Sequence, residues 1–224
     1  MFGRLRKEMK EIKRVKLPVR FARQKTPFTC GAKALQVILN FHNPEQYNLR
    51  YELETEIFEF ARLGKYDAST TPGLALFALE HGYPVEHIVK FKEIFQYPEE
   101  PISGYTMPKE EFEEKFAIDI VLFEKARQKG LKTIVVPNIT ESNILKKYLT
   151  KGIPLLAMLE LGGILHDVVI RGFSQDFYMI IDPDQGETGL HARELIRHFD
   201  TRYGVSILAI YPRKTLSKNE LLSS

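Results

Sequence analysis

Residues 24–39 read QKTPFTCGAKALQVIL, and this stretch decides the fold because a loop runs directly into an apolar helix at Cys30. The apolar residues between Ala34 and Leu39 recur at helical spacing. Cys30 is the single cysteine of the chain, and Gln24 lies six residues before it. The stretch therefore predicts a helix that carries one thiol at its N-terminus.

Further helices are predicted from periodicity and from end signals, and they fill the first part of the chain. A Thr71-Pro72 pair supplies a capping hydroxyl and a proline at the first helical position. Glycines suited to left-handed caps follow two other segments. The predicted ranges are 45–63, 71–82, 108–129 and 141–151.

Strand-like segments are rich in β-branched residues, are punctuated by turn residues, and concentrate in the second half. Helices first and an antiparallel sheet later predict an α+β fold, with a helical N-terminal half packed on a C-terminal sheet. The predicted strands are 132–136, 154–161, 166–173, 177–182 and 205–211.

Composition limits the function classes. The 224 residues suffice for a sizeable core, and 44% hydrophobic with 27% charged residues is ordinary for a globular protein. A net charge of +3 gives no case for nucleic-acid binding. One cysteine excludes an intrachain disulfide framework and is typical of a reducing, cytoplasmic setting. No apolar run is long enough to span a bilayer, and we expect no cofactor.

The chain divides into three predicted regions, of which the first is set off by its charge. Residues 1–16 carry seven basic residues against two acidic ones, which fits either a helix at a membrane surface or acidic partner, or a solvated terminal helix. Residues 17–213 form the predicted domain, with 44–137 as an enlarged helical insertion or lid. Residues 96–108 within it are predicted to be a loop, and 214–224 a tail. The oligomeric state is left open.

A cysteine nucleophile needs its thiolate stabilised and a base beside it. A free thiol with a pKa of about 8.5 is mostly protonated at neutral pH, and a helix N-terminus and a neighbouring histidine both favour the anion. We expect His166 to be that base, Asp182 to orient it, and Gln24 to donate to an oxyanion. Each has a plainer interpretation: a buried hydrophobe for the thiol, a strand edge for the histidine and a turn for the aspartate.

A hairpin argument places His166 beside Asp182. A loop of three residues, 173–175, would pair Gly172 with Asp176 and put His166 directly opposite Asp182 on one face. A two-residue turn would put the two side chains on opposite faces unless a bulge restores the register.

The chain resembles the papain-like bacteriocin-processing cysteine peptidases that cleave after double-glycine leaders, as a stand-alone member. The matching residues are Gln24, Cys30 with Gly31-Ala32, the apolar segment 155–159, the segment HDVVIRGF from His166, and Ile181-Asp182-Pro183 with Gly186. The resemblance implies a papain-like fold, with Cys30 as nucleophile, His166 as base, Asp182 as orienting group and Gln24 as oxyanion donor.

The implied function is cleavage of a peptide-like amide bond through an acyl-enzyme on Cys30, at a cleft between the Cys30 helix and the sheet. Two alternatives remain: an acyltransferase that passes the acyl group to an amine or thiol, and an inactive module that binds peptides. His191 and His198 are seven apart on a predicted short helix but lack a third ligand at suitable spacing. The segment from Asp182 to Gly186 departs from a calcium loop in its glycine position, so we predict no metal site.

Overall fold

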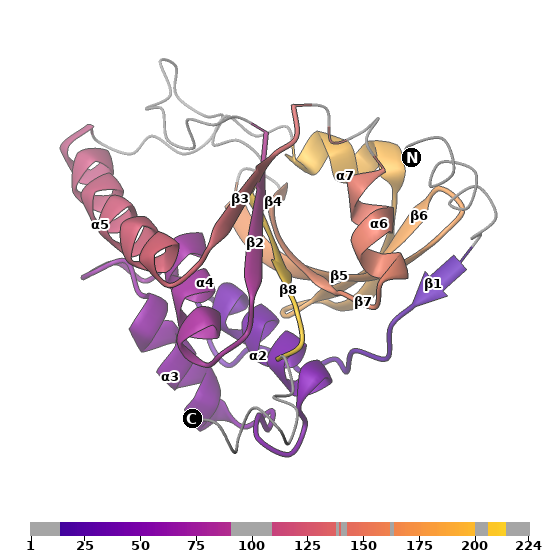
Figure 1. Cartoon of the computed structure of the whole chain (residues 1–224), viewed down its shortest axis with the longest axis horizontal. Helices are drawn as coiled ribbons and strands as arrows, with labels where there is room; N and C mark the ends of the chain where they lie inside the picture. The colour runs from indigo at the N-terminus through magenta and orange to yellow at the C-terminus, as the bar shows by residue number, and fades with distance from the viewer. Residues whose placement is uncertain are drawn as a thin grey trace, which may run out of the picture.

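A computed structural model describes residues 14–90, 109–137, 139, 143–161, 164–199 and 206–213. Helices and strands alternate irregularly along these residues (Figure 1). In chain order they are β1 (Arg14–Lys16), α2 (Cys30–His42), α3 (Tyr51–Ala61), α4 (Thr71–Glu80), β2 (Val85–Val89), α5 (Lys109–Gln128), β3 (Lys132–Val135), α6 (Ile144–Thr150), β4 (Leu155–Leu161), β5 (Ile164–Ser174), β6 (Phe177–Asp182), β7 (Gly186–His191), α7 (Ala192–Phe199) and β8 (Ser206–Ile210).

The described strands form one sheet of eight strands in the order β3-β2-β8-β4-β5-β6-β7, with β1 paired to β5. β2 and β3 are parallel, and the other pairs are antiparallel. The predicted α+β class is confirmed, but the sheet is mixed rather than wholly antiparallel. The parallel pair arises because α5 connects β2 to β3 as a crossover, which a hairpin cannot do.

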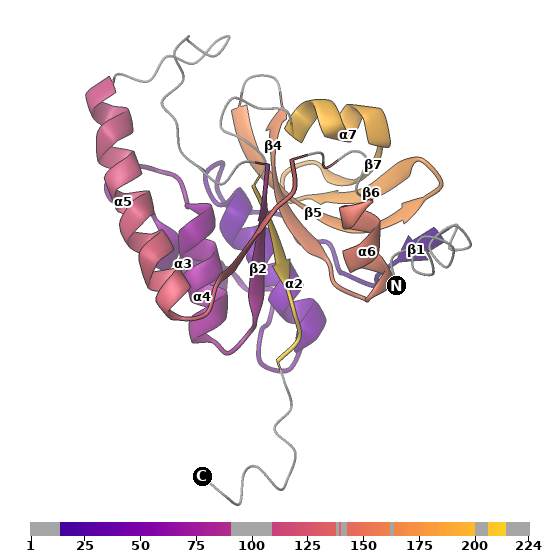
Figure 2. The same ribbon diagram turned by 45° about the horizontal axis from the view of Figure 1, so that its top comes forward.

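Helix α2 lies at the centre of the molecule. All residues from Gly31 to Asn40 are buried, as expected for a helix covered on every side. It contacts β4 and β5 on one side and α3 and α4 on the other. Figures 1 and 2 show α3, α4 and α5 grouped on one side of the strands, with α6 and α7 at the opposite end of the molecule. The N-terminus of α2 is therefore held between the helices and the sheet.

The predicted helices exist, with shifts at their ends. Helix α4 is capped by Thr70 rather than Thr71, since the Thr70 hydroxyl accepts from the Gly73 amide at 2.9 Å. Pro72 is therefore the second helical residue and not the first. Helix α3 begins at Tyr51 rather than near residue 45, because a turn at Asn43 comes first. The loop predicted over 96–108 lies outside the described residues.

Three strands were not predicted: β1, β2 and β7. Strand β2 escaped notice because Glu86 and His87 interrupt its apolar run, yet His87 is buried in the sheet and hydrogen-bonded to Ser206 of β8. Strand β1 comes from the end of the basic segment, where a helix was expected; residues 1–13 lie outside the described part. Residues 44–137 thus supply two strands of the sheet as well as helices.

Candidate functional site

Cys30 is the first residue of α2 and is partly buried. Because α2 contacts β5, the thiol comes close enough to Asp167 to form a hydrogen bond with its main chain. Asp167 directly follows His166 along β5. The structure therefore places the thiol beside the strand that carries the predicted base.

The pKa of the Cys30 thiol is raised from 9.0 to about 12, mainly by burial and next by the charge of Asp167. Main-chain hydrogen bonds from Asp167, Gly31 and Cys30 itself act in the opposite direction but do not outweigh burial. This corrects the expectation of a lowered pKa. The helix terminus does favour the anion, but removing the thiolate from water costs more.

His166 and Asp182 are joined as predicted. Nε2 of His166 donates to Oδ1 of Asp182 at 2.8 Å, and the two side chains are 16% and 8% exposed. The same Oδ1 accepts the main-chain amides of Asp184 at 2.8 Å and Gln185 at 3.1 Å. The turn after β6 thus fixes the carboxylate, which fixes the imidazole and leaves Nδ1 for another partner.

The hairpin brings these two residues together by a different register from the one predicted. The turn has two residues, Gln175 and Asp176, and Ser174 pairs with Phe177. A bulge between Ile170 and Gly172 then shifts the register, so that Val169 pairs with Ile181. The predicted three-residue loop is wrong, and the bulge, which was the stated alternative, is confirmed. His166 and Asp182 share a face as diagonal neighbours, within reach of each other.

Gln24 reaches the site from the N-terminal side. Its main-chain amide donates to the carbonyl of Pro183 at 2.9 Å, which ties it to the turn that holds Asp182. The side-chain Oε1 is buried and has no hydrogen-bond partner among the described residues. Gln24 therefore lies next to the aspartate turn, and its role as an oxyanion donor stays a prediction.

Asp167 is the site residue that sequence reasoning undervalued. It is buried, and burial raises the pKa of its carboxyl from 3.8 to about 6, although the charge of His166 acts to lower it. Its Oδ2 lies 2.5 Å from the position that a Cβ on Gly31 would occupy, so the carboxyl faces the first turn of α2. An acid within an apolar strand segment, HDVVI, was the available signal.

These groups provide the parts of an acyl-transfer site with the thiol in its protonated form. His166 is oriented by an acceptor, and amides at the start of α2 lie beside the thiol. Within the described residues, Cys30 makes no hydrogen bond to the His166 ring, so a preformed ion pair is not part of this arrangement. Proton transfer from the thiol to His166 would have to accompany bond formation.

A metal centre has no support in the described part of the chain, which contains no group of three potential ligands. His191 ends β7, whereas His198 lies on α7, so the two do not share a helix as predicted. His198 is hydrogen-bonded through Nδ1 to the Glu160 carbonyl at 2.8 Å. No helix among the described residues is long and apolar enough to cross a membrane.

Comparison with known proteins gave structural matches alone: no family model matches the chain, and no curated protein matches it. The peptidase domain of Streptococcus ComA, a bifunctional ABC transporter of a quorum-sensing pathway, matches with TM-score 0.46 and 14% identity over 85% of this chain and 98% of that one. A double-glycine motif protease from an AMS/PCAT transporter, solved with its leader peptide, matches with TM-score 0.46 and 18% identity over 90% and 96%.

A C39-like peptidase from Bacillus anthracis matches with TM-score 0.47 and 14% identity, over 90% of this chain and 99% of that one. This chain is similar over most of its length to solved peptidase domains of the double-glycine and C39-like kind.

Proposed function

We propose that this protein is a papain-like cysteine hydrolase that cleaves an amide bond in a peptide-like substrate, with Cys30 as the nucleophile. The observation that carries the proposal is the 2.8 Å hydrogen bond from His166 to an Asp182 carboxylate that its own turn holds in place. A buried, doubly anchored acceptor for a histidine on the strand beside a helix-terminal thiol is the arrangement that cysteine hydrolysis requires.

The first half-reaction forms an acyl-enzyme. As Sγ of Cys30 bonds to the substrate carbonyl carbon, its proton passes to Nδ1 of His166, and Asp182 stabilises the imidazolium. The carbonyl oxygen becomes an oxyanion, for which the Cys30 amide and the Gln24 side-chain amide are the proposed donors. The carbon–nitrogen bond then breaks, and the leaving amine takes the proton from His166.

The second half-reaction releases the acid. Neutral His166 removes a proton from water as the water oxygen attacks the thioester carbon. Collapse of this second intermediate returns the electron pair to sulfur and the proton to the thiol. Asp182 stays ionised throughout, because its role is to fix the tautomer and orientation of the imidazole.

Peptide cleavage by the full chain tests this proposal. Because the sequence resembles double-glycine peptidases, fluorogenic peptides with Gly-Gly before the scissile bond are the first probes, followed by a mixed peptide library. We expect Cys30→Ala and His166→Ala each to lower kcat/KM by at least about 1000-fold. His191→Ala, on β7, is the control and should retain activity. Cleavage that survives in Cys30→Ala would exclude the thiol as nucleophile.

A peptide-binding module is the second candidate, and the raised pKa of Cys30 favours it. A thiol with a pKa of about 12 alkylates slowly, and it would serve equally well as a buried apolar contact. Alkylation by iodoacetamide separates the two functions when it is followed against pH in wild type and His166→Ala. A rate that falls on removal of His166 supports the hydrolase, whereas equal, slow rates support the binding module.

A further inference from the structure

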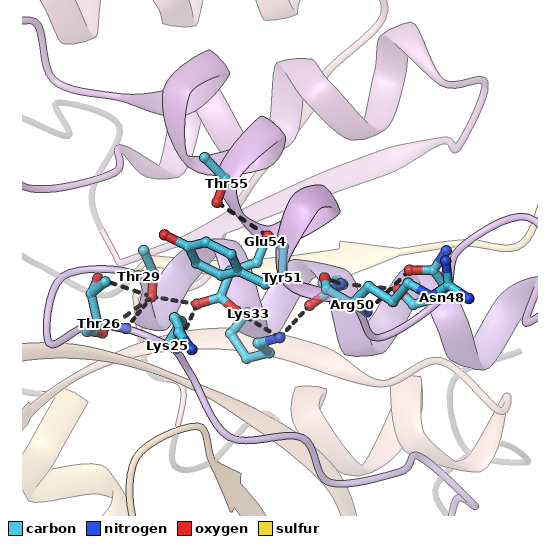
Figure 3. A network of polar contacts seen from close by, with 10 residues as sticks. Lys25, Thr26, Thr29, Lys33, Asn48, Arg50, Tyr51, Glu54 and Thr55 are labelled. Atoms are coloured by element: carbon cyan, nitrogen blue, oxygen red, sulfur yellow. Dashed lines mark hydrogen bonds and ion pairs between the residues drawn. The ribbon is translucent and has the colours of Figure 1, made fainter.

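One buried carboxylate contacts both ends of the segment that links Gln24 to Cys30. Oε1 of Glu54, on α3, accepts the main-chain amide of Lys25 at 2.8 Å and the hydroxyl of Thr29 at 2.5 Å. Lys25 directly follows the predicted oxyanion donor, and Thr29 directly precedes the predicted nucleophile. Figure 3 shows Lys25, Thr26 and Thr29 gathered at one end of the Glu54 carboxylate.

The other carboxylate oxygen is neutralised from within α2. Nζ of Lys33 lies 2.7 Å from Oε2 of Glu54, and the two side chains are 3% and 1% exposed. Lys33 also donates to Oε1 of Gln36 at 2.6 Å, and the Gln36 amide in turn donates to the carbonyls of Asn48 and Arg50. Every charge in this buried network therefore has a partner.

Stability alone is a poor reason for such a pair. An ion pair removed from water loses about as much in hydration as it gains from attraction, so the Lys33–Glu54 pair adds little net stability to the fold. The hydrogen bond of Thr29 also indicates that Glu54 serves to position this segment. Thr29 is the N-cap of α2, yet its hydroxyl contacts Glu54 and caps no helix amide. The first amides of α2 therefore stay available beside the Cys30 thiol.

The opposite anchor of the segment comes from the sheet. The Gln24 amide donates to the Pro183 carbonyl at 2.9 Å, one residue after Asp182. Segment 24–30 is thus held by Glu54 on the helical side and by the aspartate turn on the sheet side. The two proposed oxyanion donors, Gln24 and the Cys30 amide, are set relative to His166 by these two anchors.

We propose that Glu54 is a positioning residue for the reaction at Cys30, and that it acts through Thr29 and Lys25 to hold the two oxyanion donors in place. This inference rests on the proposed hydrolase function. Glu54 touches no reacting atom, so its removal should lower the rate of the step that forms the oxyanion. It should leave substrate binding and the intrinsic reactivity of the thiol nearly unchanged.

Thr29→Val removes the hydroxyl contacts with Glu54 and with the Thr26 main chain without leaving a buried charge unpaired, and Glu54→Gln, below, separates the two contacts. We expect kcat per titrated Cys30 to fall about 10- to 100-fold, since an ångström of misplacement costs that much, with KM within about threefold. Alkylation by iodoacetamide develops no oxyanion, so its rate constant should stay within about threefold of wild type. Thr29→Ser keeps the hydroxyl and should restore kcat.

Two further variants complete the comparison. Glu54→Gln should lower kcat in the same way and speed hydrogen exchange at the Lys25 amide, which loses its charged acceptor. Thr55→Val is the matched control, because the Thr55 hydroxyl bonds the Tyr51 carbonyl of its own helix and does not touch segment 24–30. The probes are the fluorogenic Gly-Gly peptide, or the best cleaved library peptide, and iodoacetamide.

The outcomes separate the two proposals. An active wild type in which Thr29→Val keeps full kcat overturns the positioning role and leaves the hydrolase intact. Equal losses in kcat and in alkylation also overturn it, because they mean that the thiol itself was disturbed. A wild type that cleaves no peptide overturns the hydrolase, and the positioning role with it.

Discussion

Asp167 sets a carboxyl group against the first turn of α2, where its charge opposes ionisation of the Cys30 thiol. The pKa of the Asp167 carboxyl is about 6, so it is mostly ionised at neutral pH. A negative charge beside a thiol disfavours the thiolate, so Asp167 lowers the reactivity of Cys30.

Replacing Asp167 with Asn should therefore make Cys30 more reactive. Without the carboxylate the pKa of the thiol should fall, although burial, the larger cause, keeps it above its ordinary value. We expect the rate of iodoacetamide alkylation at pH 8 to rise several-fold, about the factor that one nearby charge produces. Asp176→Asn, an exposed acid at the far end of the β5–β6 hairpin, is the control. An unchanged rate in Asp167→Asn would show that its charge does not reach the thiol.

One residue that contacts the segment before the thiol could not be predicted from the sequence. Gln24, Cys30, His166 and Asp182 were predicted as site residues because four chemical roles recur in a recognisable order. Glu54 was missed because it lies among other acids of a helix, at 52, 56 and 59, which look like a solvated face. Its burial depends on contact with a loop 25 to 29 residues earlier, which periodicity does not report.

Strand β5 depends on one glycine where it meets β1. A Cβ at Gly172 would lie 2.2 Å from the Val15 carbonyl oxygen, which is backbone and cannot rotate away. The β1–β5 pairing follows directly, since Lys16 is the register partner of Gly172. At this position the absence of a side chain allows two backbones to approach.

Gly172→Ala is expected to destabilise the protein by about 1–3 kcal/mol, because overpacking against a fixed backbone forces the strand to move. Gly189→Ala in β7 is the matched control, since the nearest atom to its Cβ would be the Tyr178 carbonyl oxygen at an ordinary 3.7 Å. Urea unfolding followed by circular dichroism measures both. Equal stabilities for the two variants would mean that β1 contributes no constraint at Gly172.

At the scale of elements, sequence patterns succeeded where a segment is regular and failed where tertiary contacts decide. The apolar pattern of 155–161 and 177–182 located β4 and β6. The predicted length of the turn between β5 and β6 was one residue too long, because Gln175 adopts a left-handed conformation that residue preferences did not indicate. Strand β7, with Gly186, Thr188 and Gly189, is too polar for its pairing to be predicted without β6 beside it.

The whole molecule is closed by contacts between the middle of the chain and its end. Strand β2 pairs with β8 over its full length, and Glu86 accepts hydroxyls from Tyr148 of α6 and Tyr211 after β8, at 2.6 and 2.7 Å. Residues 44–137 had been predicted as a helical insertion or lid. The division into residues 1–16, 17–213 and 214–224 stays a prediction, because much of the two terminal regions lies outside the described residues.

His87 makes this closure sensitive to acid. Burial lowers its pKa from 6.5 to about 4, so the folded protein holds it neutral while the unfolded chain takes up a proton. Its contribution to stability is therefore complete above about pH 6.5 and is lost as the pH falls through 4. Between these limits wild type should lose about 3 kcal/mol relative to His87→Gln, as a shift of this size implies.

Urea unfolding at pH 7, 5.5 and 4 gives the free energy of unfolding of wild type and of His87→Gln. The difference between the two proteins cancels the effect of buried acids such as Asp167, which both contain. That cancellation matters because the raised pKa of Asp167 acts in the opposite direction, with stability lost as the pH rises from about 3.8 to 6. His191→Gln, at the end of β7, is the control histidine. A constant difference between wild type and His87→Gln across this range would contradict burial of a neutral imidazole.

The bulge near Arg171 decides whether His166 and Asp182 lie on the same face of the hairpin, because it shifts the register by one residue. A two-residue turn alone would put the two side chains on opposite faces of this hairpin. One extra unpaired residue, in a strand or in the turn, puts them on the same face. The surplus lies in β5 here, but the same chain length would serve if it lay in the turn. Deletion of Arg171, which removes the surplus residue, should therefore keep the two side chains on one face. Deletion of one residue of β6 between 177 and 181, with the turn and the bulge kept, should put them on opposite faces and abolish the site.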